Sequence, residues 1–160
     1  SMEVVILRPP LVYGPGVKGN FLTLLKAVDR GTVLPLGAIQ NQRSLIYVGN
    51  LADVIVTATT HADAANQTFF VSDEGTVSTT SLIENIAASL NKKPRLINLP
   101  PGLLKFAGAL TGKSGAIQRL IGSLTVDSGK IRSLLNWQPP FTMTEGLKLT
   151  ADWWRSVKNK

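Results

Sequence analysis

Three glycines near the start of the chain have the spacing of a phosphate-binding loop. Residues 14–19 read Gly-Pro-Gly-Val-Lys-Gly, a literal G-x-G-x-x-G between an apolar run and a helical pattern. A dinucleotide fingerprint also needs a strand running directly into the first glycine and an acidic residue about 20 positions later. Here Arg8-Pro9-Pro10 interrupts the apolar run, Pro15 removes an N–H donor, and residues 33–36 contain no acid. We therefore interpret the motif as a crossing loop and not as a cofactor cradle.

Alternating strand and helix patterns surround this loop. The expected strands are the β-branched or apolar runs at residues 3–8, 42–48, 67–73 and 95–100. Helices are expected from Asn20 to Gly31, from Asn50 through Ala58, from the run Ser78–Ser81 to Leu90, from Pro101 through Leu110, from Asp127 through Leu135, and after a Thr142–Glu145 capping box. This alternation predicts an α/β fold with a largely parallel sheet.

Two of the expected helices carry apolar residues on one face. The helix after Asn50 has a stripe made of Leu51, Val54, Ile55 and Ala58. The helix after Pro101 has a stripe made of Leu103, Phe106, Ala107 and Leu110.

Composition excludes several kinds of site. The chain has 160 residues, 44% of them hydrophobic, which is enough for a packed core. There is no cysteine and His61 is the only histidine, so disulfides, thiolate nucleophiles, Cys-based metal sites and His-rich metal sites are excluded. A net charge of +7 favours anionic partners, but the basic residues are scattered and we expect no nucleic-acid partner. No uncharged apolar stretch is long enough to span a membrane.

The order of motifs along nearly the whole chain resembles a known family. The motifs are Arg-Pro-Pro-x-Val-Tyr-Gly-Pro-Gly at 8–16, a helix opening at Asn20, Gln-Arg-Ser-Leu-Ile-Tyr-Val-x-Asn-Leu-Ala-Asp at 42–53, and Val-Asp-Ser-x-Lys-Ile-x-x-Leu-Leu-x-Trp-x-Pro at 126–139. Together they resemble the C-terminal portion of the NAD-dependent epimerase/dehydratase family, the extended short-chain dehydrogenases that include UDP-glucose 4-epimerase-like enzymes.

The resemblance implies a fold and a domain organisation. The chain would be the C-terminal part of an extended Rossmann-type epimerase/dehydratase, with mixed parallel strands and helices, and it would lack the N-terminal cofactor-binding half. Residues 3–160 would form the nucleotide-sugar-binding domain, while Ser1-Met2 resemble a cleavage remnant. NAD or NADP would bind the intact enzyme, and we expect this part alone to bind neither.

The resemblance also assigns substrate-binding residues. Arg43 would pair with the nucleotide diphosphate, a task that suits a planar guanidinium, or it is a surface arginine at a strand end. Asn20 would hydrogen-bond the same diphosphate at a helix start, or act only as an N-cap. A second phosphate-binding arginine would be Arg119. Leu34, Pro35 and Leu36 would pack on the uracil ring, or belong only to the core.

Two residues would lie near the cofactor. The backbone around Pro10 would approach the nicotinamide side once the missing half is present, with Leu11 next to it. Many family members carry Asn at the position of Leu11, so its replacement favours a deoxy- or amino-sugar substrate.

The catalytic signature of the family is absent. The family uses Tyr-x-x-x-Lys, in which the lysine lowers the pKa of the tyrosine so that the phenolate can transfer a proton. Val17 stands four residues after Tyr13, and Leu51 stands four residues after Tyr47. We therefore predict no catalytic residue in this chain, and no activity for this part alone.

The function implied by the resemblance leaves alternatives open. The first is the substrate-binding part of a cytoplasmic NAD(P)-dependent UDP-sugar 4-epimerase that serves bacterial surface polysaccharide or O-antigen synthesis. The second is an NAD(P)H-dependent UDP-4-keto-6-deoxy-sugar reductase or a dehydratase of the same family. A non-catalytic anion-binding or interaction module on the same scaffold is the third. Because a sheet cut at this point exposes an edge and an apolar face, we also expect self-association, such as a homodimer.

Overall fold

The computed structural model describes residues 2–158, which form two compact units. Unit 1 is the described part of Ser1–Val17, Ser44–Gly75 and Thr125–Lys160, and unit 2 is Lys18–Arg43 with Thr76–Leu124. The chain passes repeatedly from one unit to the other, so each unit is assembled from segments that are far apart in sequence.

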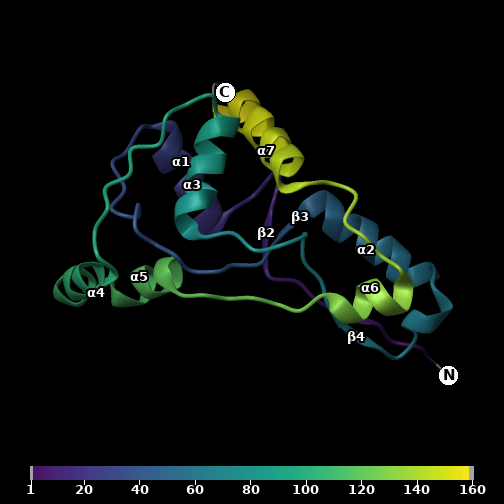
Figure 1. Cartoon of the computed structure of the whole chain (residues 1–160). Coiled ribbons are helices and arrows are strands. Elements are labelled where there is room, and N and C mark those ends of the chain that lie inside the picture. The colour runs from purple at the N-terminus through teal and green to yellow at the C-terminus, as the bar shows by residue number, and fades with distance from the viewer. Residues whose placement is uncertain (1, 159–160) are drawn as a thin grey trace. The chain divides into compact units, whose positions relative to one another are not determined.

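Parallel strands organise unit 1 (Figure 1). The pairs are β1 (Ile6–Arg8) with β4 (Thr68–Phe70), and β2 (Leu11–Tyr13) with β3 (Leu45–Tyr47). The chain after β4 connects the two pairs, because the Val71 N–H donates to the Arg8 carbonyl (3.3 Å) and the Asp73 N–H donates to the Leu45 carbonyl (2.8 Å). Parallel strands cannot be joined by tight hairpins and need long crossovers. The predicted α/β architecture with parallel strands is confirmed.

The helices of unit 1 share one apolar core with the strands. They are α2 (Val48–Thr60), the 3₁₀ turn η1 (Ala62–Ala64), α6 (Gly129–Leu135) and α7 (Met143–Lys158). Ile46, Val54, Phe69, Ile131 and Trp137 meet in this core. The predicted stripe of α2 is only partly right, because Ile55 is exposed. At 100° per residue, Ile55 falls at the edge of the face that Val54 and Ala58 define.

Unit 2 is mainly helical. Its helices are α1 (Gly19–Asp29), α3 (Thr79–Ser89), α4 (Pro101–Leu110) and α5 (Ser114–Ile121). Helix α1 packs against α3, and each contributes a buried apolar face, with Phe21 and Leu25 on α1 and Ile83 and Ile86 on α3. Helix α4 packs against α5.

Several predicted helix ends are confirmed. Ser78 is the N-cap of α3, and its Oγ accepts a hydrogen bond from the Ser81 N–H at 3.0 Å. Helix α4 begins at Pro101, and Gly31 after α1 has the left-handed φ of +69° that favours glycine. The capping box forms as predicted: the Thr142 N–H donates to Glu145 Oε2 at 2.8 Å, and the Glu145 N–H donates to Thr142 Oγ1 at 3.3 Å.

Three predicted caps were wrong. Asn20 is the second residue of α1, whose N-cap is Lys18. Asn50 lies inside α2 with a buried side chain, because the helix follows β3 directly and the amide bonds to Asp73. Ser128 is the N-cap of α6, while the carboxylate of Asp127 accepts from the N–H two residues later at 2.7 Å. Asn and Asp side chains also bond locally in turns and to buried partners, so the residue type alone does not fix the cap position.

The predicted strand pattern also needs correction. Residues 95–100 form no strand; Leu96 makes only an isolated bridge to Leu34. Proline at positions 94, 100 and 101 limits the N–H donors available to a ladder there. In contrast, Pro9-Pro10 does not end the sheet, because β2 resumes pairing with a different partner and runs directly into Gly14. Helix α5 was not predicted.

Helix α4 buries a different face from the predicted one. Its buried residues are Leu104 and Gly108, and a Cβ at Gly108 would come within 2.6 Å of the Ile117 Cδ1 atom of α5. This close approach of the two helices leaves Leu103, Phe106 and Leu110 exposed. Among the helices described within residues 2–158, none is long and apolar enough to cross a membrane.

Candidate functional site

Arg43 is fixed between two other segments of unit 2. Its N–H donates to the Val77 carbonyl at 2.9 Å, and its carbonyl accepts from the Val77 N–H at 3.0 Å. On its other side Arg43 forms a parallel bridge with Leu124. The backbone at Arg43 is therefore held by both neighbours, unlike that of an arginine at a free strand end.

The guanidinium of Arg43 is half-buried, and its one hydrogen bond within residues 2–158 is to a backbone carbonyl. Its Nη1 donates to the backbone carbonyl of Arg119. No ion pair in the described part of the chain joins Arg43 to an aspartate or glutamate. Burial desolvates the cation and lowers the pKa of Arg43 from its ordinary value. A partly desolvated guanidinium with further N–H donors is suited to an anion with several oxygens, such as a phosphate or diphosphate.

Asn41 fastens the end of α5 close to Arg43. This side chain is 7% exposed, and its Nδ2 donates to the carbonyls of Leu120 (3.2 Å) and Gly122 (2.8 Å). The Asn41 Oδ1 accepts from the N–H of Thr79 at 2.8 Å, and the Thr79 hydroxyl donates to the Leu120 carbonyl at 2.6 Å. This network was not predicted. The only sequence signal for it is the amide residue two positions before Arg43, and its neighbours in sequence are typical of a loop.

Arg119 lies near Arg43 through its backbone. The side chain of Arg119 is exposed in the last turn of α5, and the backbone carbonyl of Arg119 accepts the hydrogen bond from Arg43. The structure thus brings two of the predicted phosphate-binding residues together, with the side chain of Arg119 on the surface. The role of Arg119 toward phosphate stays a prediction.

Asn20 lies in the first turn of α1. The N-cap residue Lys18 makes no side-chain hydrogen bond to the helix, and the first turn contains no acidic residue. The first N–H groups of a helix have no partner within the helix, so this end favours an anion. Asn20 is exposed, and no hydrogen bond joins it to Arg43. Its predicted contact with the diphosphate remains untested.

The three residues predicted to pack on the uracil ring differ in exposure. Leu34 and Pro35 are half-buried, whereas Leu36 is 5% exposed. Thr80 at the start of α3 fixes this segment, because its hydroxyl donates to the Leu36 carbonyl at 2.6 Å and accepts from the Ile39 N–H at 3.1 Å. Leu34 and Pro35 therefore have side-chain surface available to a ligand, and Leu36 contributes mainly to the core.

A buried carboxylate, Asp73, organises unit 1. Asp73 is 3% exposed and accepts hydrogen bonds from the Tyr13 hydroxyl (2.9 Å), the Tyr47 N–H (3.0 Å) and the Asn50 Nδ2 (2.7 Å). Asn50 also bonds to the backbone of Phe141, donating at 2.9 Å and accepting at 2.9 Å. The network joins β2, β3, α2 and the segment before α7, and it was not predicted.

Neither tyrosine of the chain is prepared to act as a base. Burial, followed by the charge of Asp73 and the hydrogen bond to it, raises the pKa of Tyr13 far above its ordinary value. Burial also raises the pKa of Tyr47. A catalytic tyrosine of the epimerase type needs the opposite shift.

The residues predicted to lie near the cofactor belong to unit 1. Pro10 and Leu11 are half-buried, and Leu11 begins β2 and is paired with Leu45. At the first of the nearby glycines, Gly14, a Cβ would come within 2.4 Å of Val48, whereas Gly16 and Gly19 have open space around them. Close packing therefore explains Gly14 without a cofactor, and contact of Pro10 and Leu11 with NAD(P) stays a prediction.

The cavities within unit 1 do not contain the predicted residues. One of about 230 Å³ is lined by Glu74, Pro139, Phe141, Thr142 and Met143. Ligand pockets commonly have volumes of about 300–1,000 Å³. Over residues 2–158, no three His, Asp or Glu side chains gather to hold a metal ion.

The chain is similar in sequence and in fold to known proteins. The model of the 3-beta hydroxysteroid dehydrogenase/isomerase family matches residues 1–100. The chain belongs to this family. The predicted resemblance to the NAD-dependent epimerases and dehydratases is confirmed with it.

The relatives of this member of the 3-beta hydroxysteroid dehydrogenase/isomerase family include nucleotide-sugar enzymes. A UDP-glucose 4-epimerase of Vibrio cholerae is 46% identical over 161 residues, covering 100% of this chain and 49% of the relative. A UDP-glucose 4-epimerase of Thermotoga maritima, solved with UDP-glucose, matches with a TM-score of 0.65 and 21% identity over 98% of this chain and 47% of its own. A UDP-glucuronic acid 4-epimerase of Bacillus cereus, solved with NAD, matches with a TM-score of 0.70 and 18% identity over 95% and 44%.

The extent of these matches agrees with the predicted fold. The chain spans about half the length of the curated relatives it matches. Its fold is that of the C-terminal part of epimerase and dehydratase structures.

Proposed function

We propose that this chain is the nucleotide-sugar-binding part of an NAD(P)-dependent UDP-sugar 4-epimerase. The observation that carries the proposal is the half-buried guanidinium of Arg43, which has no acidic partner in the described chain. Sequence comparison supports the same proposal, because the chain is 46% identical to a UDP-glucose 4-epimerase. A diphosphate supplies the missing negative charge.

The residues of this chain bind and orient the substrate. Arg43 pairs with the diphosphate, with Arg119 nearby, and the amide of Asn20 donates to it at the start of α1. Leu34 and Pro35 pack on the uracil ring, supported by the buried Leu36. NAD or NADP, held mainly by the rest of the protein, takes and returns a hydride at a sugar carbon. Pro10 and Leu11 contact it from this side.

The proposal extends to the domain organisation and the cellular role of the whole enzyme. Residues 3–160 are the substrate domain of a longer enzyme, and this part alone does not turn over substrate. The enzyme works in the bacterial cytoplasm and supplies a sugar for surface polysaccharide or O-antigen. Leu11, which replaces an amide common in the family, favours a deoxy- or amino-sugar.

Calorimetric titration of UDP into the full-length protein tests the role of Arg43. Arg43→Ala should weaken UDP binding by about 10- to 100-fold, since a hydrogen bond to a charged group is worth about 1.5–3 kcal/mol. Arg30→Ala removes an exposed arginine at the end of α1 and should leave the affinity unchanged. Equal affinities for wild type and Arg43→Ala would remove the basis of the proposed function.

An activity assay separates the two enzymatic alternatives. An epimerase returns its hydride and needs no added cofactor, whereas a 4-keto-sugar reductase consumes NAD(P)H as it works. The absorbance of reduced cofactor during turnover with UDP-sugars distinguishes the two reactions. If the full-length protein converts no UDP-hexose, the epimerase proposal fails.

The alternative of a non-catalytic anion-binding module is favoured by the surroundings of the two tyrosines. The hydroxyl of Tyr13 donates to Asp73, and neither Tyr13 nor Tyr47 is followed by a lysine four residues later. An anion-binding module would bind UDP without turnover. Natural sequence before residue 3 that encodes a glycine fingerprint and Tyr-x-x-x-Lys would decide in favour of the enzyme.

Self-association through the β1–β4 pair is part of the proposal. Ile6 and Phe70 are exposed apolar residues of this two-stranded pair, and Val4, two residues before β1, is also exposed. Unpaired strand edges with apolar side chains favour pairing with another chain or with the rest of the protein. Sedimentation of this 160-residue chain at high concentration should show dimers or larger species, and clean monomers would contradict the expectation.

A further inference from the structure

One stretch of unit 2 is basic and contains no acidic residue. Between residues 85 and 126 there is no Asp or Glu, while the basic residues are Lys92, Lys93, Arg95, Lys105, Lys113 and Arg119. Lys92 pairs with Asp29 at 2.8 Å. The other five take part in no ion pair with the described residues. The stretch includes α4 and α5 and accounts for most of the chain's surplus of positive charge.

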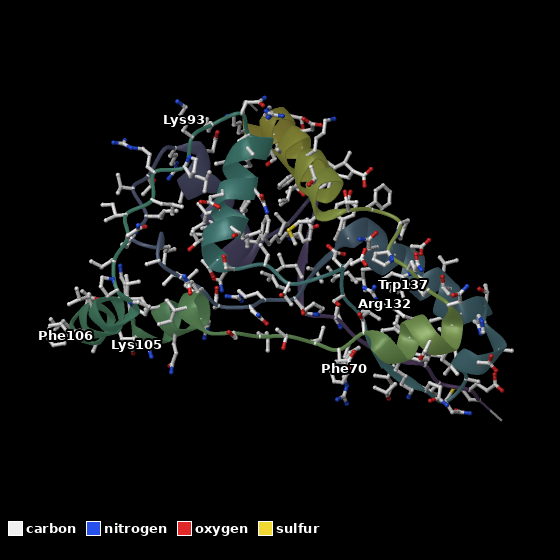
Figure 2. All side chains as sticks on the ribbon, in the orientation of Figure 1. Phe70, Lys93, Lys105, Phe106, Arg132 and Trp137 are labelled. Carbon is white, nitrogen blue, oxygen red and sulfur yellow. The ribbon has the colours of Figure 1, made fainter. Side chains whose placement is uncertain are left out.

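Helix α4 presents large apolar side chains within this basic stretch. Leu103, Phe106 and Leu110 are 54%, 64% and 73% exposed. Their spacing of three and four places them on one face. The adjacent face, with Leu104 and Gly108, is the one packed on α5. Figure 2 shows Phe106 projecting outward from α4, with Lys105 on the same turn.

The combination of apolar and cationic side chains selects the kind of partner. Exposed apolar residues grouped on one helix face indicate a surface that another phase or molecule covers. A second copy of this face would bring two sets of cations together without an acidic residue to neutralise them. A nucleic acid would use the charge but leave the Leu and Phe side chains in water. An anionic bilayer surface accommodates both kinds of side chain.

We propose that α4 is an interfacial helix that docks this protein on an anionic membrane surface. Leu103, Phe106 and Leu110 enter the boundary between head groups and acyl chains, and Lys105 and Lys113 contact lipid phosphates. At ten residues, α4 is about 15 Å long, so it lies on the surface and does not cross the bilayer. This inference goes beyond the proposed function, which concerns a nucleotide sugar bound near Arg43.

Vesicle flotation of the full-length protein tests the apolar face. Binding is measured with vesicles of equal parts phosphatidylglycerol and phosphatidylethanolamine, and with pure phosphatidylcholine. The protein should bind the anionic vesicles, and the double variant Phe106→Ser with Leu110→Ser should lower partitioning by about tenfold or more. The matched control is Ile55→Ser with Val56→Ser, two exposed apolar residues of α2, which should not change it.

The charge contribution has its own variant. Lys105→Gln should weaken binding to the anionic vesicles by about fivefold. Lys148→Gln removes an exposed lysine of α7 and should have no comparable effect. Binding should fall as salt is added, because the cationic contribution is screened.

Each result decides for or against the proposal. Absence of binding to anionic vesicles, or binding equal in the α4 and α2 double variants, overturns it. A change of oligomeric state in the α4 variant without a change in vesicle binding also overturns it and assigns the face to another copy. UDP affinity is measured on the same variants, so loss of membrane binding with normal UDP binding separates this inference from the proposed function.

Discussion

Asp73 in unit 1 is a buried carboxyl group and Arg43 in unit 2 is a half-buried guanidinium, and their surroundings differ. Asp73 accepts hydrogen bonds from three different residues of its own unit. Arg43 donates to one backbone carbonyl and has no acidic partner in the described chain. Removing the partners of a buried polar group destabilises the fold, whereas a half-buried cation without an acidic partner can still accept an anionic ligand. The comparison supports a structural role for Asp73 and is the reason why we propose a binding role for Arg43.

The largest effect is expected for Asp73→Ala. The substitution removes the carboxylate that accepts from the Tyr13 hydroxyl, the Tyr47 N–H and the Asn50 amide, and should lower the free energy of unfolding of unit 1 by about 3–5 kcal/mol. Hydrogen exchange of the β2 and β3 amides in the full-length protein measures the loss. Asp63→Ala, at an exposed position in η1, should change it by less than about 0.5 kcal/mol. Equal losses would mean that the network does not stabilise unit 1.

Asn41→Ala should have the next largest effect, and it should lower both the stability of unit 2 and the affinity for UDP. It removes an amide that is bonded to Thr79, Leu120 and Gly122, at a cost of about 2–3 kcal/mol in unit 2. UDP affinity should fall as well, because the end of α5 is no longer fixed beside Arg43. Exchange of the α3 amides and UDP titration give the two readouts. Asn85→Ala on the exposed side of α3 serves as the control, and unchanged UDP binding in Asn41→Ala would separate the network from the site.

Alkaline pH should weaken unit 1 through Tyr13. The folded state raises the pKa of Tyr13, while the unfolded chain ionises near its ordinary value of about 10. Above about pH 10 the unfolded state therefore binds fewer protons than the folded state, and stability falls as the pH rises. Tyr13→Phe should lose about 1 kcal/mol at neutral pH and show a flatter dependence above pH 10. Parallel curves for the two proteins would show that Tyr13 does not cause the decline.

The smallest effect on stability is expected for Arg43→Ala. Because the guanidinium makes one hydrogen bond and no ion pair with the described residues, its loss should change the free energy of unfolding of unit 2 by less than about 1 kcal/mol. Hydrogen exchange at Val77, whose N–H bonds to the Arg43 carbonyl, is the measurement. A loss as large as that of Asp73→Ala would end the distinction between a structural and a binding charge.

Local sequence patterns predicted much of the framework. The apolar periodicity located five of the helices to within a few residues, and the capping box at Thr142 and Glu145 formed as expected. The pattern failed where the deciding contact comes from elsewhere in the chain. Helix α4 buries Leu104 and Gly108 because α5 packs there. The sequence of residues 101–110 does not indicate which of the apolar faces of this helix packs against another helix.

The candidate site was predicted in part. Arg43, Asn20 and Arg119 were found from a resemblance in motif order, and the contact between Arg43 and Arg119 follows from the structure. Asn41, Thr79 and Asp73 were missed, because their partners lie 23 to 81 residues away in the sequence. A polar residue that is buried by distant segments has the same local pattern as one in a surface loop.

By itself the sequence determined the α/β class, the order of most elements, the family, and the absence of cysteine and of Tyr-x-x-x-Lys. These depend on residue type and on short-range spacing, which the chain carries whatever it packs against. Only the tertiary structure decided that Asp73 is buried among donors of its own unit, that Arg43 has no acidic partner in the described chain, and that Phe106 faces water. Burial and hydrogen bonding between distant segments are properties of the packed chain, because each requires a partner that local sequence does not specify.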